Sequence, residues 1–505
     1  MDLNTLIDIM PTVRASKRGD GADVGAFCYS SRDVKPGSVF FALKGGQVDG
    51  HDYIPEAIEA GAGCIVAQTP ELDDCHTSWI QVRDTREAMA HAAAALCDHP
   101  SRKLPVVGVT GTNGKTTIAF LMHYLVQRAR YRCGMLGTVH YDLGERIEEA
   151  THTTPESVEI QSLLGQMVDA DCRGAVLEVS SHALSQHRVD SVEFDAGIFT
   201  NLSQDHLDYH RTMENYFESK ALLGELMCKQ EHKTKPTFVI NRDDTHGQRL
   251  ARRFQDRLQV ITYGMGIGSD FRATQPRSDF NGTSFQMEAK GRSFLVRIPL
   301  IGRYNVYNTL AVLAAASAMK LNLRESVQHM ADAPQVPGRL EVIDHGGGFK
   351  VFVDYAHTPD ALENVLKTLR DLSPNRLICV FGCGGNRDQE KRSLMGQAAE
   401  QFSDYSVITS DNPRKEDPKA IIADIAKAFR GQNYVTMEDR REAITAALEM
   451  ADSRDIVVIA GKGHEATQQF ADRTIEFDDR DEVFKALQAL DFNPKRSKTV
   501  VGGRS

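Results

Sequence analysis

The sequence from Gly108 to Thr117 is GVTGTNGKTT, and it directly follows the apolar stretch Leu104–Val107. A glycine-rich turn between a strand and a helix lets backbone N–H groups approach phosphate oxygens. A lysine in such a turn places positive charge near the terminal phosphates, and the next hydroxyl can reach magnesium. Lys115 and Thr116 stand at these two places. The stretch therefore predicts an ATP-binding turn at the end of a strand in an α/β fold.

The spacing of the glycines departs from the common P-loop. Five residues separate Gly108 from Gly114, and position 109 is valine, whereas the common pattern has four residues between its glycines. The turn is therefore a variant P-loop, and this variation reduces the number of protein families to which the chain could belong.

The size and composition of the chain predict several soluble domains. A chain of 505 residues exceeds what a single hydrophobic core usually holds, and we expect three domains. The net charge of −10 gives no general affinity for nucleic acid or anionic membranes. The cysteines show no CxxC pair, which indicates reduced and mostly buried thiols. No secretory signal or long apolar run is present, so we expect a cytoplasmic protein that neither spans nor binds a membrane.

Apolar runs alternate with helical stretches along the whole chain, which predicts an α/β fold class. Residues 1–103 form a small N-terminal α/β domain, with strands in 38–43 and 63–67 and helices in 53–60 and 86–97. Residues 104–338 form a central P-loop-type ATPase domain with a mostly parallel sheet, with strands in 105–110, 175–179, 196–200 and 237–240 and a helix in 308–319. Residues 339–505 form a C-terminal Rossmann-like domain, with strands in 351–355, 377–381, 405–410 and 455–460. We assign no function to the tail 493–505, which has no apolar period.

Glu178 lies within the apolar strand expected at 175–179. An isolated carboxylate is costly there unless it faces a cation, and magnesium beside the phosphate turn would satisfy this need. The alternative is a carboxylate satisfied by local N–H groups or by His182. The phosphate turn favours the first interpretation.

The segment Thr200–His210 concentrates aspartates and histidines after another strand, where α/β folds bind ligands. His206 is a candidate metal ligand, although a loop histidine is more often solvated. Lys220 follows on a helix, and the residues alone favour an exposed lysine. His357, after the strand expected at 351–355, lies in a turn that either contacts a nucleotide or caps a helix.

Polar, glycine-rich turns follow the last strands: 382–387, 411–414 and 461–465. Turns at matching strand ends would converge on one crevice. Arg387 and Arg414 offer forked donors for carboxylates, and Glu465 offers an acceptor for an ammonium group. Together they predict a site for a zwitterionic amino acid, while each arginine alone would more often form a surface ion pair.

Together these motifs resemble the Mur ligases, ATP-dependent amide-forming enzymes of peptidoglycan synthesis, over residues 20 to 480. The family's variant P-loop has the form seen at 108–116. Within the family, the Asp411–Arg414 motif is similar to that of members that select meso-diaminopimelate rather than lysine. The resemblance implies that meso-diaminopimelate is added to UDP-N-acetylmuramoyl-L-alanyl-D-glutamate, with ATP and Mg²⁺ as cofactors and a monomeric enzyme.

Carried over residue by residue, the resemblance implies a contact set for each ligand. The UDP-muramoyl-dipeptide is expected to contact Ser31, Gly46, Gln47, Val48, Thr153, Thr154, Ser180, Gln186 and Arg188. ATP is expected to contact Gly111, Thr112, Asn113, Gly114, Lys115, Thr116, Thr117, Asn305, Arg339 and His357. Diaminopimelate is expected to contact Arg387, Asp411, Asn412, Pro413, Arg414, Gly461 and Glu465. Magnesium is expected at Thr116, Glu178, His206 and a carbamylated Lys220, and the expected catalytic residues are Lys115, Glu178, His206 and Lys220.

The family mechanism matches these residue types. A glutamyl carboxylate attacks the γ-phosphate to give an acyl phosphate and ADP, and the diaminopimelate amine then displaces phosphate. We expect the third domain to close onto the second during this reaction.

Other functions remain open from the residues. A folylpolyglutamate synthetase-like enzyme shares the phosphate turn and the acyl-phosphate chemistry, but it leaves the Ser31 region and the turn 411–414 unexplained. A nucleotide-regulated scaffold without catalysis is a further alternative, and it has no need for Lys115, Glu178, His206 and Lys220 together.

Overall fold

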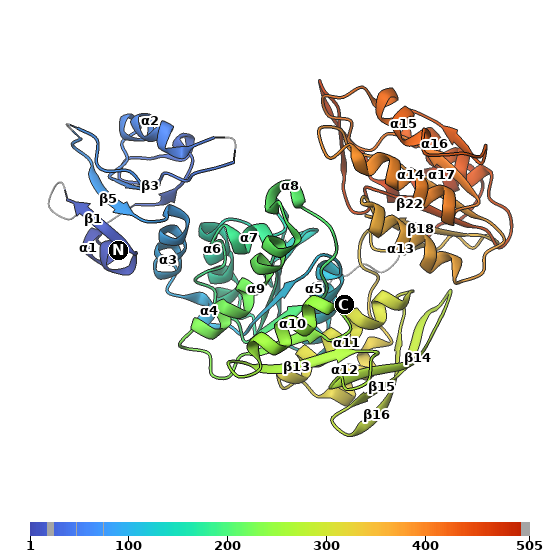
Figure 1. The fold of residues 1–505 in the computed structure, drawn as a ribbon, viewed down its shortest axis with the longest axis horizontal. Helices are drawn as coiled ribbons and strands as arrows, with labels where there is room; N and C mark the ends of the chain where they lie inside the picture. Colours follow the sequence, from blue (N-terminus) through green and yellow to red (C-terminus); the bar gives the residue numbers. More distant parts are fainter. Residues whose placement is uncertain (18–24, 47, 74, 496–505) are drawn as a thin grey trace. The chain divides into compact units, whose positions relative to one another are not determined.

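The computed structural model describes residues 1–17, 25–46, 48–73 and 75–495. The chain divides into two compact units, Met1–Ser269 with Ala311–Asn322 and Asp270–Leu310 with Leu323–Ser505. Gln47 and the tail from residue 496, for which we made predictions, lie outside the described residues. Helices accompany sheets in both units (Figure 1), which confirms the predicted α/β class.

The N-terminal part of the first unit contains one sheet, in the order β1-β5-β4-β3-β2. Only the β1–β5 pair is antiparallel. The elements are α1 (Leu3–Ile9), β1 (Thr12–Ser16), β2 (Phe27–Cys28), η1 (Ser31–Asp33), β3 (Val39–Phe41), η2 (Gly50–Tyr53), α2 (Ile54–Glu59), β4 (Cys64–Ala67), β5 (Ser78–Val82), α3 (Thr85–Leu96) and α4 (Pro100–Lys103). Leu6 of α1 and Ala88 of α3 pack on one face of the sheet, whereas Ala57 of α2 packs on the other.

The second sheet begins at the predicted P-loop strand. Its part in the first unit runs β13-β12-β11-β6-β10-β7-β8-β9. The elements are β6 (Val106–Thr110), α5 (Lys115–Arg128), β7 (Gly134–Leu136), β8 (His140–Asp142), β9 (Ile147–Glu149), α6 (Ser157–Asp169), β10 (Ala175–Glu178), α7 (Ser181–Ser185), β11 (Ala196–Phe199), α8 (Leu207–His210), α9 (Met213–Lys229), β12 (Thr237–Asn241), α10 (Thr245–Phe254) and β13 (Gln259–Gly264). From β13 to β7 the strands are parallel, as predicted, and β8 and β9 add an antiparallel edge.

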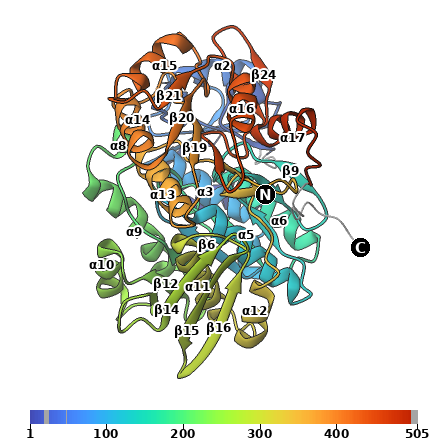
Figure 2. The same ribbon diagram turned by 90° about the vertical axis from the view of Figure 1, so that its right-hand side faces the viewer.

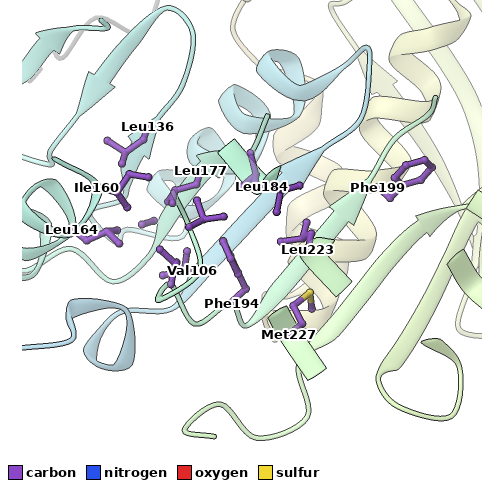
Figure 3. Close-up of a cluster of buried hydrophobic side chains, with 14 of the residues drawn as sticks. Val106, Leu136, Ile160, Leu164, Leu177, Leu184, Phe194, Phe199, Leu223 and Met227 are labelled. Carbon is purple, nitrogen blue, oxygen red and sulfur yellow. The ribbon is translucent and has the colours of Figure 1, made fainter. Parts of the chain in front are cut away.

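Apolar side chains fix the P-loop strand in this sheet. Val106 of β6, Leu177 of β10 and Leu223 of α9 belong to one buried cluster, in which Phe194 also lies (Figure 3). A Cβ atom on Gly108 would stand 2.7 Å from the Phe194 ring, so the strand needs glycine there. This packing holds the carboxyl ends of β6, β10 and β11 side by side.

The second unit contains an antiparallel meander and a six-stranded sheet. The meander is β14 (Phe271–Asp279), β15 (Gly282–Ala289) and β16 (Arg292–Ile298). The next helix, α11 (Arg303–Ala318), belongs to this unit up to Leu310 and to the first unit from Ala311, and α12 (Leu323–Met330) belongs to this unit again. The six-stranded sheet runs β17-β18-β22-β19-β20-β21, and every pair except β17–β18 is parallel. The strands of this sheet and the helices between them are β17 (Glu341–Ile343), β18 (Lys350–Asp354), α13 (Pro359–Arg370), β19 (Leu377–Phe381), α14 (Glu390–Phe402), β20 (Tyr405–Ile408), α15 (Pro418–Ala426), β21 (Tyr434–Thr436), α16 (Arg440–Glu449) and β22 (Ile456–Ala460). A separate two-stranded hairpin, β23 (Thr467–Gln469) and β24 (Thr474–Glu476), and the helix α17 (Asp479–Ala489) follow.

Helices cover both faces of the six-stranded sheet, as expected for a Rossmann-like domain (Figure 2). Leu362 of α13 and Met395 of α14 join one core cluster, and Ala443 of α16 and Val483 of α17 join the other. The five-stranded, eleven-stranded and six-stranded sheets each fall within one of the three expected residue ranges, although the domain boundaries themselves stay a prediction.

Two further features are the state of the cysteines and the character of the helices. All nine cysteines lie within the described residues, and none forms a disulfide. Among the described helices, none has both the length and the apolar character needed to cross a membrane.

Candidate functional site

The predicted phosphate turn joins β6 to α5. Gly111 has φ +146° and Gly114 has φ +91°, and Gly114 caps the amino end of α5. A Cβ atom on Gly111 would stand 1.8 Å from the Thr200 hydroxyl, so only glycine fits there. The turn therefore delivers the amino end of a helix to the carboxyl edge of the sheet, where helix N–H groups favour an anion.

The segment after β11 fixes the shape of this turn. Asn201 accepts the Thr112 N–H through its backbone oxygen at 2.9 Å, and its side-chain Oδ1 accepts the Asn113 N–H at 3.0 Å. The Thr200 hydroxyl donates to the Asn113 carbonyl at 2.6 Å. The turn is preorganised by the protein itself before any phosphate binds.

Lys115 and Thr116 lie at the start of α5. The Lys115 ammonium donates to the carbonyls of Gly111 and Thr112, both at 2.9 Å, and so lies across the turn. The Thr116 hydroxyl donates to Oε2 of Glu178 at 2.9 Å. A direct hydrogen bond thus joins the phosphate turn to the Glu178 carboxylate, which was predicted to face it.

The Glu178 carboxylate is buried at the end of β10, with 1% of the residue exposed. It accepts the Thr138 N–H at 2.9 Å and the Thr138 hydroxyl at 3.1 Å, in addition to Thr116. Protein donors satisfy it, but they come from Thr116 and Thr138, which are distant in the sequence, and His182 is not among them. A Cβ atom on Gly137 would stand 2.4 Å from Oε1, so a glycine makes room for this carboxylate.

Lys220 contradicts the exposed lysine that its residue type alone favours. It is 1% exposed on α9, and its ammonium lies 4.6 Å from the centre of the Tyr216 ring. Burial and the nearby Lys115 hold its pKa well below the usual value. Within the described part of the chain, its ammonium makes no hydrogen bond or ion pair with a carboxylate. This setting favours an uncharged amine, which is the form that reacts with carbon dioxide.

His206 caps α8 in a left-handed conformation, with φ +53°. Its ring meets His182 edge to face at 5.0 Å and Tyr216 at 6.2 Å. Burial lowers the pKa of His206, and burial with the neighbouring histidines lowers the pKa of His182 to about 4. Neutral imidazoles at physiological pH are the form that can bind a metal.

Tyr216 links this cluster to the phosphate turn. Its hydroxyl lies 3.2 Å from the Thr112 hydroxyl, and its ring stacks on His210 at 4.9 Å. His210 is buried and lies within hydrogen-bond distance of Ser181 and Ser219. We did not predict a role for Tyr216, although it stands one helical turn before Lys220, where α9 must present both side chains on one face.

The residues expected to hold the muramoyl-peptide form one network beside Glu178. The Thr154 hydroxyl donates to the Glu178 carbonyl at 2.7 Å and accepts the Ser180 N–H at 3.1 Å. Arg188 donates to the Thr154 carbonyl at 2.7 Å and to Oε1 of Gln186 at 2.8 Å. The Thr153 hydroxyl lies 3.1 Å from the Thr138 hydroxyl, which connects Thr153 to this network.

The residues expected to contact UDP lie in the N-terminal part. Ser31 begins η1, and its hydroxyl donates to Glu56 at 3.1 Å. Gly46 and Val48 are exposed in the loop after β3. No hydrogen bond in the described residues joins Ser31 to Gly46 or Val48.

The nucleotide contacts expected beyond the P-loop belong to the second unit. Arg339 lies over the Tyr355 ring at 4.8 Å, and His357 meets the same ring at 4.5 Å. Asn305 is buried in α11, where it donates to the Ile301 carbonyl at 2.8 Å and accepts from Asn308 at 2.9 Å. The prediction did not anticipate that Tyr355 joins Arg339 to His357.

The three C-terminal turns converge, as their strand positions predicted. Gly385 N–H donates to the Asn412 carbonyl at 2.9 Å, and Arg414 donates to the Gly385 carbonyl at 2.9 Å. A Cβ atom on Gly461 would stand 2.6 Å from Oδ2 of Asp411, and that oxygen is buried without a hydrogen-bond partner in the described residues. Pro413 lies between these residues, and its carbonyl would contact a Cβ on Gly385 at 1.9 Å.

A buried lysine completes this cluster. Lys462 is 0% exposed and donates to Oδ1 of Asn412 at 3.2 Å and to Oε2 of Glu465 at 3.0 Å. Glu465 also accepts from Asn412 Nδ2 at 2.9 Å. Glu465 therefore already has a cationic partner, and Arg387 is exposed. The sequence predicted the turn that contains Lys462 but no role for this lysine, because residue type alone does not distinguish a buried lysine from a solvated one.

Unmodified side chains do not form a metal cage in the described residues. No cluster of three or more His, Cys, Asp and Glu side chains there could hold a metal ion. A metal at the phosphate turn would need the Thr116 hydroxyl, phosphate oxygens or a modified lysine as further ligands.

The fold and the phosphate turn define an α/β nucleotide-binding protein. Sequence profiles of the Mur ligase middle domain, the Mur ligase glutamate ligase domain and the Mur ligase family catalytic domain match residues 109–316, 338–463 and 26–96. The chain belongs to the Mur ligase family.

Individual relatives agree with this family. The UDP-N-acetylmuramoyl-L-alanyl-D-glutamate–2,6-diaminopimelate ligase of Geobacter metallireducens is 42% identical, over 96% of this chain and 98% of the relative. A solved structure of a ligase of that name is 35% identical, with a TM-score of 0.67 over 93% of this chain and 95% of the other. A folylpolyglutamate synthase from Mycobacterium tuberculosis, complexed with ADP and AMPPCP, is 22% identical, with a TM-score of 0.63 over 75% of this chain and 92% of its own. It shares the fold.

Proposed function

We propose that this protein joins meso-2,6-diaminopimelate to UDP-N-acetylmuramoyl-L-alanyl-D-glutamate in the cytoplasm, as a monomer, with conversion of ATP to ADP and phosphate. The observation that carries this proposal is the convergence of the turns 382–387, 411–414 and 461–465 on one cluster of charged groups. Relatives that are diaminopimelate ligases over nearly their full length support it.

The nucleotide would bind at the turn 111–117. Its phosphates would meet the amino end of α5 and the Lys115 ammonium, which must then leave the carbonyls of Gly111 and Thr112. Asn305, Arg339 and His357 are the further contacts that the family resemblance gives.

Magnesium fits the chemistry of the residues at this turn. Thr116, Glu178, His206 and Lys220 would hold it, provided that Lys220 carries a carbamate. The Thr116–Glu178 contact at 2.9 Å places a hydroxyl and a carboxylate together, and oxygen ligands are those that magnesium prefers. When bound, the metal would offset the charge of the phosphates.

Lys220 would act as a carbamate. Its buried, uncharged amine can add carbon dioxide, with loss of one proton, and the product is an anion. This change replaces a neutral amine beside Lys115 with a negative group.

Lys115 would bring the two reacting anions together. The substrate carboxylate and the γ-phosphate repel by about 4 kcal/mol at about 4 Å and an effective dielectric constant of about 20. A fixed ammonium offsets this repulsion without reorganisation during the reaction. The Thr154–Arg188 network would hold the dipeptide, and its guanidinium suits a carboxylate.

At the amino-acid site, Arg414 would bind a carboxylate of diaminopimelate that lysine lacks. Its fork is already oriented by the Gly385 carbonyl. The unpartnered Oδ2 of Asp411 and the Glu465 carboxylate suit an ammonium group. These side chains would thus distinguish diaminopimelate from lysine by the second carboxylate, which only diaminopimelate carries.

The test is phosphate release with ATP, magnesium and UDP-muramoyl-dipeptide, with meso-diaminopimelate, L-lysine or neither added. We expect release that depends on diaminopimelate alone. Release with lysine contradicts the role of Arg414, and no release with either revives the folate-type ligase or the scaffold. The variant Lys115→Met is the control, because release that survives in it comes from a contaminant.

A further inference from the structure

A fully buried ion pair lies behind the two turns that carry Asp411 and Glu465. Arg440 and Asp479 each have a 0% exposed side chain. The guanidinium donates from Nε to Oδ1 at 2.7 Å and from Nη2 to Oδ2 at 2.8 Å, in a bidentate arrangement. Arg440 is the first residue of α16 and Asp479 is the first residue of α17.

The same guanidinium also holds the ends of two parallel strands. Nη2 donates to the Ala460 carbonyl at 2.9 Å, and Nη1 makes a longer contact with the Ser410 carbonyl at 3.4 Å. Ala460 directly precedes the turn 461–465, and Ser410 directly precedes the turn 411–414. One side chain therefore ties together the starting points of both turns.

The charge of Arg440 also reaches the groups that face the turns. Asp411 and Glu465 both interact electrostatically with the guanidinium. A Cβ atom on Gly461 would stand 2.6 Å from Oδ2 of Asp411 and 3.8 Å from Nη2 of Arg440, so these groups are close neighbours.

A buried pair of this kind is not explained by stability alone. The cost of removing both charges from water often equals their attraction, and apolar residues of similar size can replace such pairs without loss. A lysine in place of Arg440 would keep the charge, but it could not make the bidentate contact and hold two carbonyls at once. The fork is therefore the property that this place requires.

We propose that Arg440, oriented by Asp479, is a positioning residue that sets the distance between the turns 411–414 and 461–465, and thereby the fit of the amino-acid substrate. This inference depends on the proposed function, since it assigns the substrate to these turns. Arg440 itself does not contact the substrate.

The test compares Arg440→Lys with Arg376→Lys in the full-length protein. Arg376 also pairs with an aspartate: its Nε and Nη2 donate to Oδ2 of Asp455 at 2.9 and 2.6 Å, although Arg376 is partly exposed. Arg376 precedes β19 and Asp455 precedes β22, at the opposite ends of the strands from the turns. We expect Arg440→Lys to raise the KM for diaminopimelate about ten- to a hundred-fold, because small misplacements are costly in a fitted site. In Arg440→Lys, the KM values for ATP and the UDP-muramoyl-dipeptide should stay within about two-fold of wild type. In Arg376→Lys, the KM values for diaminopimelate, ATP and the dipeptide should all stay within about two-fold of wild type.

The double variant Arg440→Met with Asp479→Leu separates positioning from folding, since it leaves no unpaired buried charge. We expect it to fold and to show the same selective rise in KM. An unchanged KM for diaminopimelate, an equal rise in all three KM values, or a double variant that does not fold would each overturn the inference. Absence of diaminopimelate-dependent activity in the wild type would instead overturn the proposed function.

Discussion

At the scale of single residues, the environment of Lys220 has the clearest chemical meaning. A buried ammonium normally has a carboxylate partner, and this one has the Tyr216 ring and a second cation, Lys115, nearby. The protein therefore destabilises the charged amine at a place beside the phosphate turn. A carbamate suits this place because it puts a negative group beside Lys115, where the ammonium form is disfavoured.

We predict that Lys220→Ala lowers diaminopimelate-dependent phosphate release at least about 100-fold, because fixed charges at a transferring phosphoryl group commonly contribute factors of this size. Wild-type activity should fall when bicarbonate and carbon dioxide are removed, and it should return when they are added. Lys229→Ala is the control, since this lysine ends the same helix. Activity of Lys220→Ala at the wild-type level without bicarbonate would contradict the carbamate.

Residue identity alone could not reveal these environments. The sequence indicated that Glu178 needs a partner, but Thr138, which donates twice to it, is 40 residues away. Lys462 and Lys220 are buried, yet nothing in their neighbouring letters distinguishes them from solvated lysines. Burial of a charged side chain depends on the packing of distant elements, which one sequence does not show.

At the scale of elements, the strand–turn–helix unit 106–128 follows directly from its sequence. The valines predict a buried strand, and the glycines predict a turn with positive φ, as observed at Gly111 and Gly114. The parallel strands that the sequence predicted lie within two residues of the observed ends, but the parallel strands β2, β5, β7, β13 and β21 were not predicted. The meander β14–β16 was missed, because β14 is mostly exposed after Ala273 and so lacks a continuous apolar pattern.

The turn itself gives a prediction for Gly111→Ala. The new methyl group would collide with the Thr200 hydroxyl, which also holds the Asn113 carbonyl. We expect the affinity for ADP with magnesium to fall at least about ten-fold, since the turn loses the shape that fits a phosphate. Calorimetric titration measures this change.

The matched control for that substitution is Gly165→Ala in α6. A Cβ atom there meets nothing within 4 Å, and alanine favours a helix over glycine by about 1 kcal/mol. This variant should bind ADP normally and melt no lower than wild type. Equal affinities in the two variants would show that the turn does not hold the phosphates.

At the scale of the whole molecule, the predicted dipeptide contacts and the predicted diaminopimelate contacts belong to different units, whereas the predicted ATP contacts are divided between both units. Thr154, Ser180 and Arg188 belong to the first unit, and Asn412 and Glu465 belong to the second. The sequence predicted the parallel core of the larger sheets and the turns at their strand ends, but the contact sets for three ligands came from the family resemblance. The expected closure of the domains also stays a prediction, which small-angle scattering with an ATP analogue and substrate can test.

Hydrogen exchange can locate each substrate along the entire chain. We predict that the UDP-muramoyl-dipeptide slows amide exchange at 153–156 and 180–188, because its binding would hold the network of Thr154 and Arg188 closed. Diaminopimelate, added to protein that already holds the dipeptide and an ATP analogue, should then slow exchange at 411–416 and 461–469. The meander 271–298 serves as the internal control, because no contact is assigned to it. If diaminopimelate protects the meander or residues 1–103 and not the turns, the amino-acid site lies elsewhere. If it protects the turns selectively, the binding of diaminopimelate is distinguished from the binding of the dipeptide.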